Sequence, residues 1–275
     1  MERSNAMLVG LTIRQWTATK HDKNVSAEVE QTHTAHNAGR YNKRLIDKTH
    51  LAPINQIASQ LREYHYSRTL AWSDQGERML PAELFMEYRD EMAARKQKFQ
   101  TAVADFVRLY PDLVTEARTR LNTMFRPLDY PPAADLFGMF GIETVFMPIP
   151  NAQDFRIALS QEAQESLREQ ITNSILDRQK AAVSDCWARI YEVVERIYAQ
   201  CSKEKTVIRT SLMDNASELA SLLGALNITN DPGLNEAEDI IRKLIMPVDR
   251  LRESSSLRLA VASDAARLLE KIPKE

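Results

Sequence analysis

The chain has 275 residues, enough for one large domain or two modest ones, and 44% of its residues are hydrophobic. Its 36 Lys and Arg against 38 Asp and Glu leave a formal net charge of -2, which excludes a global electrostatic pull toward nucleic acid or an anionic membrane. Only seven glycines occur, few for a fold rich in hairpins or nucleotide-binding turns, so we expect helices to dominate.

The first expected element is a strand over residues 8–16. Val9, Leu11 and Ile13 alternate with less apolar residues, and this period of two is typical of a half-buried strand. Residues 1–6 are excluded from the expected fold, because Ser4-Asn5-Ala6 resembles an expression scar and Met7 opens a more convincing sequence.

Residues 25–67 are expected to contain two helices and a polar connection. The first helix is predicted near residues 26–34, followed by a basic, poorly packed segment. Pro53 suits the first turn of a helix, and an apolar stripe follows at spacings of three and four, which predicts a second helix over residues 52–67. Residues 74–76, Asp-Gln-Gly, predict a turn.

A long helical arm is predicted for residues 81–123, with Pro81 in its first turn. Large apolar residues recur at heptad positions along it and define a helix-packing seam: Phe85, Tyr88, Met92, Phe99 and Phe106. A seam of this length implies lengthwise packing against a partner helix, either in the same chain or in a second copy. Pro111 removes one helical hydrogen bond and predicts a bend.

A second arm of nearly equal length is predicted for residues 160–203, where an apolar stripe runs from Leu167 to Cys201. Between the arms, residues 140–149 and 155–159 are rich in β-branched and aromatic residues bounded by prolines, which predicts a small β-hairpin. Shorter helices follow near residues 206–226, 234–245 and 248–272, and three consecutive serines at 254–256 weaken the last of them.

These elements predict a mainly α fold: a long antiparallel helical hairpin with a small β element and a C-terminal helical bundle. The expected domains are residues 1–80, holding the N-terminal strand and short helices; residues 81–203, holding the helical hairpin with its β insert near 140–159; and residues 204–275, holding the bundle.

The two cysteines indicate a reducing compartment. Cys186 and Cys201 are fifteen positions apart on one predicted helix, about four turns, which is beyond the reach of a disulfide. No apolar run is long enough to span a bilayer, and the first residues lack the apolar core of a signal peptide. We therefore expect a cytoplasmic protein without a membrane partner.

The sequence contains no catalytic or metal-binding pattern that we would assign. All five histidines lie in the first quarter of the chain, and His33, His36 and Glu30 come nearest to a metal site, but their spacing is not a zinc signature. Both cysteines are far in sequence from every histidine, and no glycine-rich phosphate loop occurs. We therefore predict no metal, no cofactor and no enzymatic activity.

A basic and aromatic grouping is the one candidate for nucleic-acid binding. Arg and Lys neutralise phosphates while aromatic rings stack on bases, as single-strand binders require. Residues 1–50 carry eight Lys and Arg against five Asp and Glu, a modest excess. The competing interpretation is that Tyr64 belongs to a core stripe and the arginines to a solvated face. The candidate residues are Arg40, Tyr41, Lys43, Arg44, Arg62, Tyr64, His65, Tyr66 and Arg68.

Several segments resemble a family of uncharacterised bacteriophage and plasmid proteins: Leu8-Val9-Gly10-Leu11-Thr12-Ile13-Arg14-Gln15-Trp16, Gly39-Arg40-Tyr41-Asn42-Lys43, Arg68-Thr69-Leu70-Ala71-Trp72 with Leu80-Pro81, and Phe155-Arg156. The genes of that family tend to lie near those of a MoxR-like AAA+ ATPase and a von Willebrand A-type protein. The resemblance implies an accessory protein in the pathway of that ATPase, and it transfers no functional residue.

Three functional hypotheses follow. The preferred one is a non-enzymatic interaction or adaptor protein of a mobile element with a protein partner, for which the resemblance implies an AAA+ ATPase. The first alternative is a phage nucleic-acid-binding protein that uses the basic and aromatic grouping. The second is a self-assembling structural protein in which the helix-packing seam pairs between copies.

Overall fold

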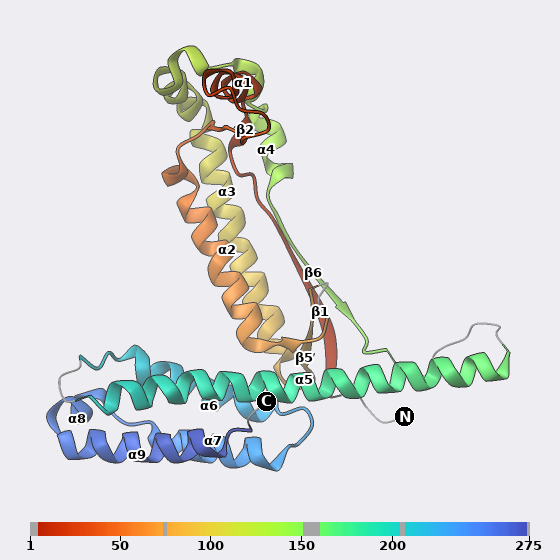
Figure 1. The fold of residues 1–275 in the computed structure, drawn as a ribbon, viewed down its shortest axis with the longest axis vertical. Coiled ribbons are helices and arrows are strands. Elements are labelled where there is room, and N and C mark those ends of the chain that lie inside the picture. The colour runs from red at the N-terminus through yellow and green to blue at the C-terminus, as the bar shows by residue number, and fades with distance from the viewer. Residues whose placement is uncertain (1–4, 74–75, 151–159, 204–206, 274–275) are drawn as a thin grey trace. The chain divides into compact units, whose positions relative to one another are not determined.

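The computed structural model describes residues 5–73, 76–150, 160–203 and 207–273. It is 69% helical, with long helices and a small antiparallel sheet of four strands, which confirms the mainly α fold class (Figure 1). The chain divides into two compact units. Unit 1 consists of residues 1–10, 66–86 and 145–275, and unit 2 consists of residues 11–65 and 87–144.

The four-stranded sheet is ordered β4-β5-β1-β6. Its strands are β1 (Ala6–Arg14), β4 (Leu70–Ala71), β5 (Glu77–Pro81) and β6 (Gly141–Met147). The predicted N-terminal strand is confirmed, but the exclusion of residues 1–6 was wrong for Ala6, which is buried and lies opposite Pro81 in the ladder. Pro81 ends β5 and is also the N-cap of the 3₁₀ turn over residues 82–84, after which the predicted first arm begins. As the last residue of a strand, it removes no donor from the middle of the ladder.

The predicted β element between the arms is partly confirmed. Strand β6 forms, and its neighbour in the sheet is β1. The second predicted strand, residues 155–159, lies outside the described residues. The predicted turn at residues 74–76 is supported by Gly76, which adopts a φ of +104° and donates a 3.4 Å hydrogen bond to the Ser73 carbonyl. Asp74 and Gln75 lie outside the described residues.

The helical part of unit 1 is built on α5 (Gln161–Cys201), which packs along α9 (Ser255–Lys271) and against α6 (Ser211–Leu226). Helices α7 (Pro232–Leu244) and α8 (Val248–Glu253) complete this bundle. Cys186 and Cys201 are free and buried in it, as predicted. The predicted weak point at the serines is a true helix break, because Ser254 accepts a 3.2 Å hydrogen bond from the Leu257 amide and so caps α9.

Unit 2 contains an antiparallel pair of long helices, α2 (Lys48–Arg68) and α3 (Phe85–Leu121), each of which extends a few residues into unit 1. His50 near the start of α2 lies 3.6 Å from Glu116 near the end of α3. At the other end, the Tyr64 and Tyr88 rings stack with centroids 6.0 Å apart. The first arm therefore has α2 as its antiparallel partner, whereas the second arm, α5, belongs to unit 1 and packs on α9 and α6.

The partner of the first arm was missed because Pro53 suggested too late a start for α2. The Asp47 side chain accepts hydrogen bonds from the Thr49 amide and hydroxyl at 2.9 and 2.8 Å, so the helix begins at Lys48 and contains Pro53. Helix α3 likewise continues through Pro111 to Leu121, so this proline does not end the helix.

The helix-packing seam is used inside this chain. Tyr88, Met92, Phe99 and Phe106 are buried, and the half-buried Phe85 packs edge-on against Phe146 at 5.2 Å. Val103 and Tyr110 extend the buried face, whereas Leu109 is exposed. The self-assembly hypothesis thereby loses the surface on which it depended.

The remaining elements of unit 2 include the segments that contact a buried lysine, Lys43. They include a two-stranded sheet of β2 (Thr19–His21) and β3 (Asn42–Arg44), α1 (Lys23–Thr32), α4 (Ala133–Met139), and the 3₁₀ turns η2 (Asn122–Met124) and η3 (Pro127–Asp129). A further 3₁₀ turn, η1 (Ala82–Leu84), precedes α3 in unit 1. The predicted helix near residues 26–34 is confirmed as α1.

Lys43 is 1% exposed, and its ammonium group makes three short contacts. It lies 2.7 Å from an Asp129 carboxylate oxygen and 3.1 Å from one of Asp22, and it donates a 2.8 Å hydrogen bond to the Met124 carbonyl. Burial alone would lower the pKa of Lys43, but the hydrogen bonds with Asp129 and Asp22 together outweigh it and raise that pKa. The three residues tie β3 to the start of α1 and to η3.

Replacing Lys43 should destabilise unit 2 strongly. Lys43→Met leaves the buried Asp22 carboxylate without its ion-pair partner and leaves Asp129 with only the half-exposed Lys20, so we expect the free energy of unfolding to fall by about 3–5 kcal/mol. Urea titration followed by far-UV circular dichroism measures this change. Lys20→Ala is the matched control, because Lys20 also contacts Asp129, at 3.0 Å, but is half exposed and should contribute about 1 kcal/mol or less. Equal losses in the two variants would contradict this assignment.

The same cluster predicts a loss of stability in acid. The hydrogen bond from Lys43 lowers the pKa of Asp22, and for Asp129 the opposing effect of burial is outweighed by hydrogen bonds from Lys43 and Lys20. Because both folded-state pKa values lie below the ordinary 3.8, the stabilisation is present above pH 3.8 and is lost as the pH falls through the lowered values. We expect the stability difference between wild type and Lys43→Met to shrink in that range, which acid titrations of both proteins can test.

Candidate functional site

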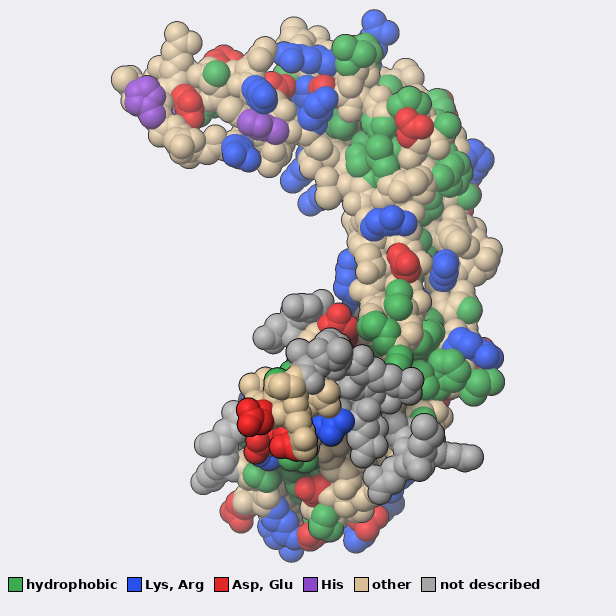
Figure 2. All heavy atoms as spheres, turned by 90° about the vertical axis from the view of Figure 1, so that its right-hand side faces the viewer, with side chains coloured by type: hydrophobic (Ala, Val, Ile, Leu, Met, Phe, Trp, Pro, Cys, Tyr) green, Lys and Arg blue, Asp and Glu red, His purple; other side chains and the backbone are tan. Residues whose placement is uncertain are grey.

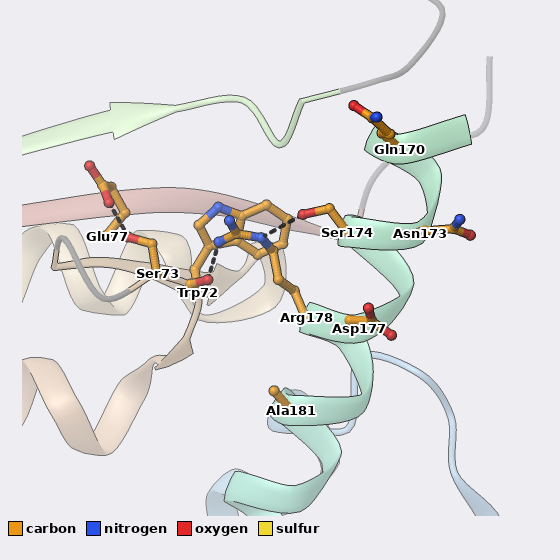
Figure 3. Close-up of a pocket in the computed structure, with 9 residues that line it drawn as sticks. All are labelled: Trp72, Ser73, Glu77, Gln170, Asn173, Ser174, Asp177, Arg178 and Ala181. Carbon is orange, nitrogen blue, oxygen red and sulfur yellow. Dashed lines mark hydrogen bonds between the residues drawn. The ribbon is translucent and has the colours of Figure 1, made fainter. Parts of the chain in front are cut away.

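The candidate site is a groove in unit 1 with a volume of about 900 Å³. One wall comes from the β4–β5 hairpin, which contributes Trp72, Ser73 and Glu77. The other wall comes from the first half of α5 (Figure 3), which contributes Gln170, Asn173, Ser174, Asp177, Arg178 and Ala181. We call this site the α5 groove.

The two walls are joined by a contact between Arg178 and Trp72. The guanidinium carbon of Arg178 lies 4.8 Å from the centre of the Trp72 ring, within range of a cation–π interaction. Arg178 also donates hydrogen bonds to the Trp72 carbonyl and, at 3.3 Å, to the Ser174 hydroxyl. Figure 3 shows Arg178 and Ser174 extending from α5 toward the indole. This contact fixes the position of the hairpin against the helix.

Further along α5, a second arginine holds the end of α2. Arg189 donates hydrogen bonds to the carbonyl groups of Tyr66, Ser67 and Thr69 at 3.0, 3.0 and 2.6 Å. These are carbonyls at a helix terminus, which lack partners within the helix. Asp185 accepts a 2.9 Å hydrogen bond from Arg189 and so fixes its orientation.

Arg78 of β5 holds the same stretch of backbone as Arg189. Its guanidinium donates to the Thr69 hydroxyl at 2.7 Å and to the Thr69 carbonyl at 3.0 Å, and it lies 4.7 Å from the centre of the Tyr66 ring. Asp185 is 3.7 Å from it. The backbone that leads into β4 is thus held by two arginines.

The outer rim of the groove presents polar groups to solvent. Within the described parts of the chain, the side-chain amides of Gln170 and Asn173 have no hydrogen-bond partner. Asn173 and Asp177 point away from the indole (Figure 3), and Asp177 forms an ion pair with the exposed Lys180, at 3.4 Å. Carboxamides can both donate to and accept from a peptide backbone, so the rim suits an extended peptide.

Electrostatically, the groove favours a cationic guest. Its lining contains two carboxylates, Glu77 and Asp177, and one cation, Arg178. A hydrogen bond from the Ser73 hydroxyl is the main reason that the pKa of Glu77 is lowered. Glu77 therefore stays ionised at neutral pH, and its lowered pKa makes it a weak general base for Ser73.

The helix that forms the outer wall is unusually exposed. Fully buried residues of α5 are confined to its second half: Ala182, Cys186, Ile190, Val194, Ile197 and Cys201. Over residues 161–181 none is fully buried, although Leu167, Ile171 and Ile175 of the predicted stripe are half-buried there. Most helical stability in proteins comes from packing of an apolar face. Packing against the described part of the chain therefore stabilises this half of α5 only slightly.

The predicted nucleic-acid grouping is not a single surface. Three of its members are buried: Lys43 in the ion cluster, Tyr64 at 8% exposure and His65 at 2%. Tyr64 lies under the Arg95 guanidinium, 4.7 Å away, and His65 shares a 2.7 Å hydrogen bond with the Tyr88 hydroxyl. These three residues cannot contact phosphates or bases, so the prediction was wrong for them.

The other members of the grouping are dispersed. Arg62 donates to the Gln15 side chain at 3.2 Å, Arg68 pairs with Glu218 at 2.8 Å, and Tyr66 packs under Arg78. Arg40, Tyr41 and Arg44 are exposed before the start of α2, a helix of 21 residues that spans about 30 Å. Figure 2 shows Lys and Arg side chains interspersed with acidic and uncharged ones on the visible face.

Among the described residues, no three His, Cys, Asp or Glu side chains come together as metal ligands, and no helix is long and apolar enough to cross a membrane. His33 and His36 are both exposed, at the end of α1 and just beyond it. The Glu30 carboxylate instead accepts a hydrogen bond from the Ala38 amide at 3.3 Å.

Sequence reasoning did not find the α5 groove. Trp72 and Arg178 are far apart in the chain, and no local spacing links them. Trp72 belongs to a segment that was noted only for the family resemblance. Arg178 interrupts the apolar stripe of α5, but the sequence around it does not indicate that it contacts Trp72. The turn signal at Gly76 was the only local hint that a hairpin would bring Trp72 and Glu77 together.

We expect binding of single-stranded DNA or RNA to be weak and to depend only modestly on salt, because Arg40, Tyr41 and Arg44 are the members of the grouping that remain together and exposed, and they supply only two cations. Fluorescence anisotropy at two salt concentrations measures this binding for wild type and for Arg40→Ala/Arg44→Ala. Lys43 must be left intact, because its loss would unfold the region. Tight, salt-resistant binding that the double variant abolishes would contradict this expectation.

Comparison with protein-family models, with curated proteins and with solved structures finds no match to this chain. The geometry of the α5 groove and its surroundings is therefore the basis for the functional proposal.

Proposed function

We propose that this protein is a non-enzymatic interaction protein, an adaptor, that binds an extended segment of a partner protein in the α5 groove. The observation that carries the proposal is the contrast between the two halves of α5. The second half is packed in the bundle, whereas residues 161–181 form a helix wall with no fully buried residue beside a groove of about 900 Å³.

The chemistry of the groove supports a peptide as the guest. The rim amides of Gln170 and Asn173 can pair with backbone groups, which every peptide presents regardless of sequence. The carboxylates of Glu77 and Asp177 favour a segment with a Lys or Arg side chain. Arg178 joins the two walls through its contact with Trp72, so binding needs little rearrangement of the groove, which reduces its entropic cost.

The family resemblance suggests which partner to test first. It implies an accessory role beside a MoxR-like AAA+ ATPase encoded by a mobile element, in the cytoplasm of a bacterial host. An adaptor for such an ATPase would hold a segment of the ATPase or of its substrate. The α5 groove offers one surface for that segment.

Selection from a displayed library of random linear peptides tests the proposal directly. We expect wild-type protein to enrich linear peptides with a basic residue. The variant Asn173→Ala/Asp177→Ala should bind them about tenfold more weakly, since it loses one hydrogen-bonding amide and one carboxylate. Glu169→Ala is the matched control, because Glu169 is an exposed acid of the same helix that does not line the groove.

Two outcomes would contradict the proposal. One is the absence of any enriched peptide. The other is equal weakening by the groove variant and by Glu169→Ala, which would indicate a general effect of charge. In a parallel experiment, size-exclusion chromatography with a purified MoxR-like ATPase should show co-elution with wild type and with Glu169→Ala but less with the groove variant. Co-elution that is unchanged in the groove variant would place the ATPase contact elsewhere on the protein.

A further inference from the structure

Unit 2 contains a separate pocket with a volume of about 470 Å³. Its residues come from the end of β1, from α3 and α4, and from the start of β6. The volume lies in the range of roughly 300–1,000 Å³ that is typical of small-molecule sites. We call it the α3 pocket.

The floor of the α3 pocket is apolar and well fixed. Phe99, Val103, Phe140 and Ile142 are all buried and line it. The rings of Phe99 and Phe140 meet edge to face with centroids 6.4 Å apart, and Phe106 packs against Phe140 at 6.0 Å. Such contacts hold aromatic rings in one arrangement, so the pocket is formed before any ligand arrives.

The rim carries positive charge and no carboxylate. Arg14, Lys96 and the amide of Gln100 line the mouth, beside Phe137, whose side chain is exposed although it is large and apolar. Neither Arg14 nor Lys96 forms an ion pair or hydrogen bond with any residue in the described parts of the chain. Figure 2, which faces the side of α4 and β6, shows hydrophobic side chains next to Lys and Arg side chains there.

Gly141 explains how Arg14 reaches the mouth. A Cβ atom at this position would lie only 3.0 Å from one terminal nitrogen of the Arg14 guanidinium and 3.2 Å from its Nε. The guanidinium therefore lies directly against the backbone of β6, where only a glycine leaves room for it without displacement. This placement keeps one cation beside an apolar cavity.

We propose that the α3 pocket binds an amphipathic carboxylate, a small molecule with an apolar chain or ring that ends in an acid group. The apolar part would fill the cavity over Phe99 and Phe140, and the carboxylate would lie between Arg14 and Lys96. Burial of apolar surface provides most of the affinity, and the two cations select an anion over a neutral or positively charged molecule. This inference is independent of the α5 groove and goes beyond the proposed adaptor function.

Calorimetric titration with decanoate tests the assignment. We expect binding of one decanoate per chain, and about tenfold weaker binding to Arg14→Gln/Lys96→Gln, which keeps side-chain length but removes both charges. Lys98→Gln is the matched control, because Lys98 is exposed on the same helix and does not line the pocket. Gly141→Ala should also weaken binding, because the added methyl group displaces the Arg14 guanidinium.

The neutral analogue 1-decanol distinguishes the contribution of the apolar cavity from that of the two cations, Arg14 and Lys96. It should bind wild type and the double variant with equal affinity, since it has no charge for Arg14 and Lys96 to attract. Unfolding curves that match wild type would show that the substitutions at these exposed positions leave the fold intact. Decanoate affinity that is unchanged in the double variant would overturn the proposal. The proposal would also be overturned if the wild-type protein bound a Glu-rich peptide ending in Phe tightly but did not bind decanoate.

Discussion

The hydrogen bonds from Arg189 to the end of α2 are the interaction on which the arrangement of unit 1 depends. Three carbonyl groups at the end of that helix accept hydrogen bonds from one side chain of α5. An arginine suits this role because its planar group carries five donors and never loses its charge at neutral pH. Without Arg189 these carbonyls would lose that donor, and α5 would hold this part of the chain through the contact of Arg178 with Trp72.

The elements with strong local signals could be predicted from the sequence. The period-two pattern around Val9 predicted β1, the stripe on α5 predicted its length, and the serines before Leu257 predicted a weak point in the last helix. The pairing of long helices could not be predicted, because an apolar seam specifies that a helix is packed but not against which partner. Pro53 also obscured the true start of α2, which Asp47 determines.

The sites were harder to predict because both depend on residues that meet only in the folded chain. Lys43 and Tyr64 looked like binding residues in the sequence, since charge and aromatic character are visible there and burial is not. Lys43 is instead neutralised by Asp22 and Asp129, acids from two other segments. For the α3 pocket the error runs the other way. In the sequence Arg14 and Lys96 look like ordinary surface cations, but in the fold they line a pocket together with Phe99 and Phe140.

The continuity of α5 has a thermodynamic consequence. One uninterrupted helix carries both the groove wall and the core of the bundle, and helix formation is cooperative along the chain. A guest that orders residues 161–181 would therefore also reduce fraying of the segment around Ala182, where burial begins. By linkage, any such guest raises the stability of a bundle that it does not touch. Occupancy of the groove would then be reported by slower amide hydrogen exchange in α9, the main packing partner of α5.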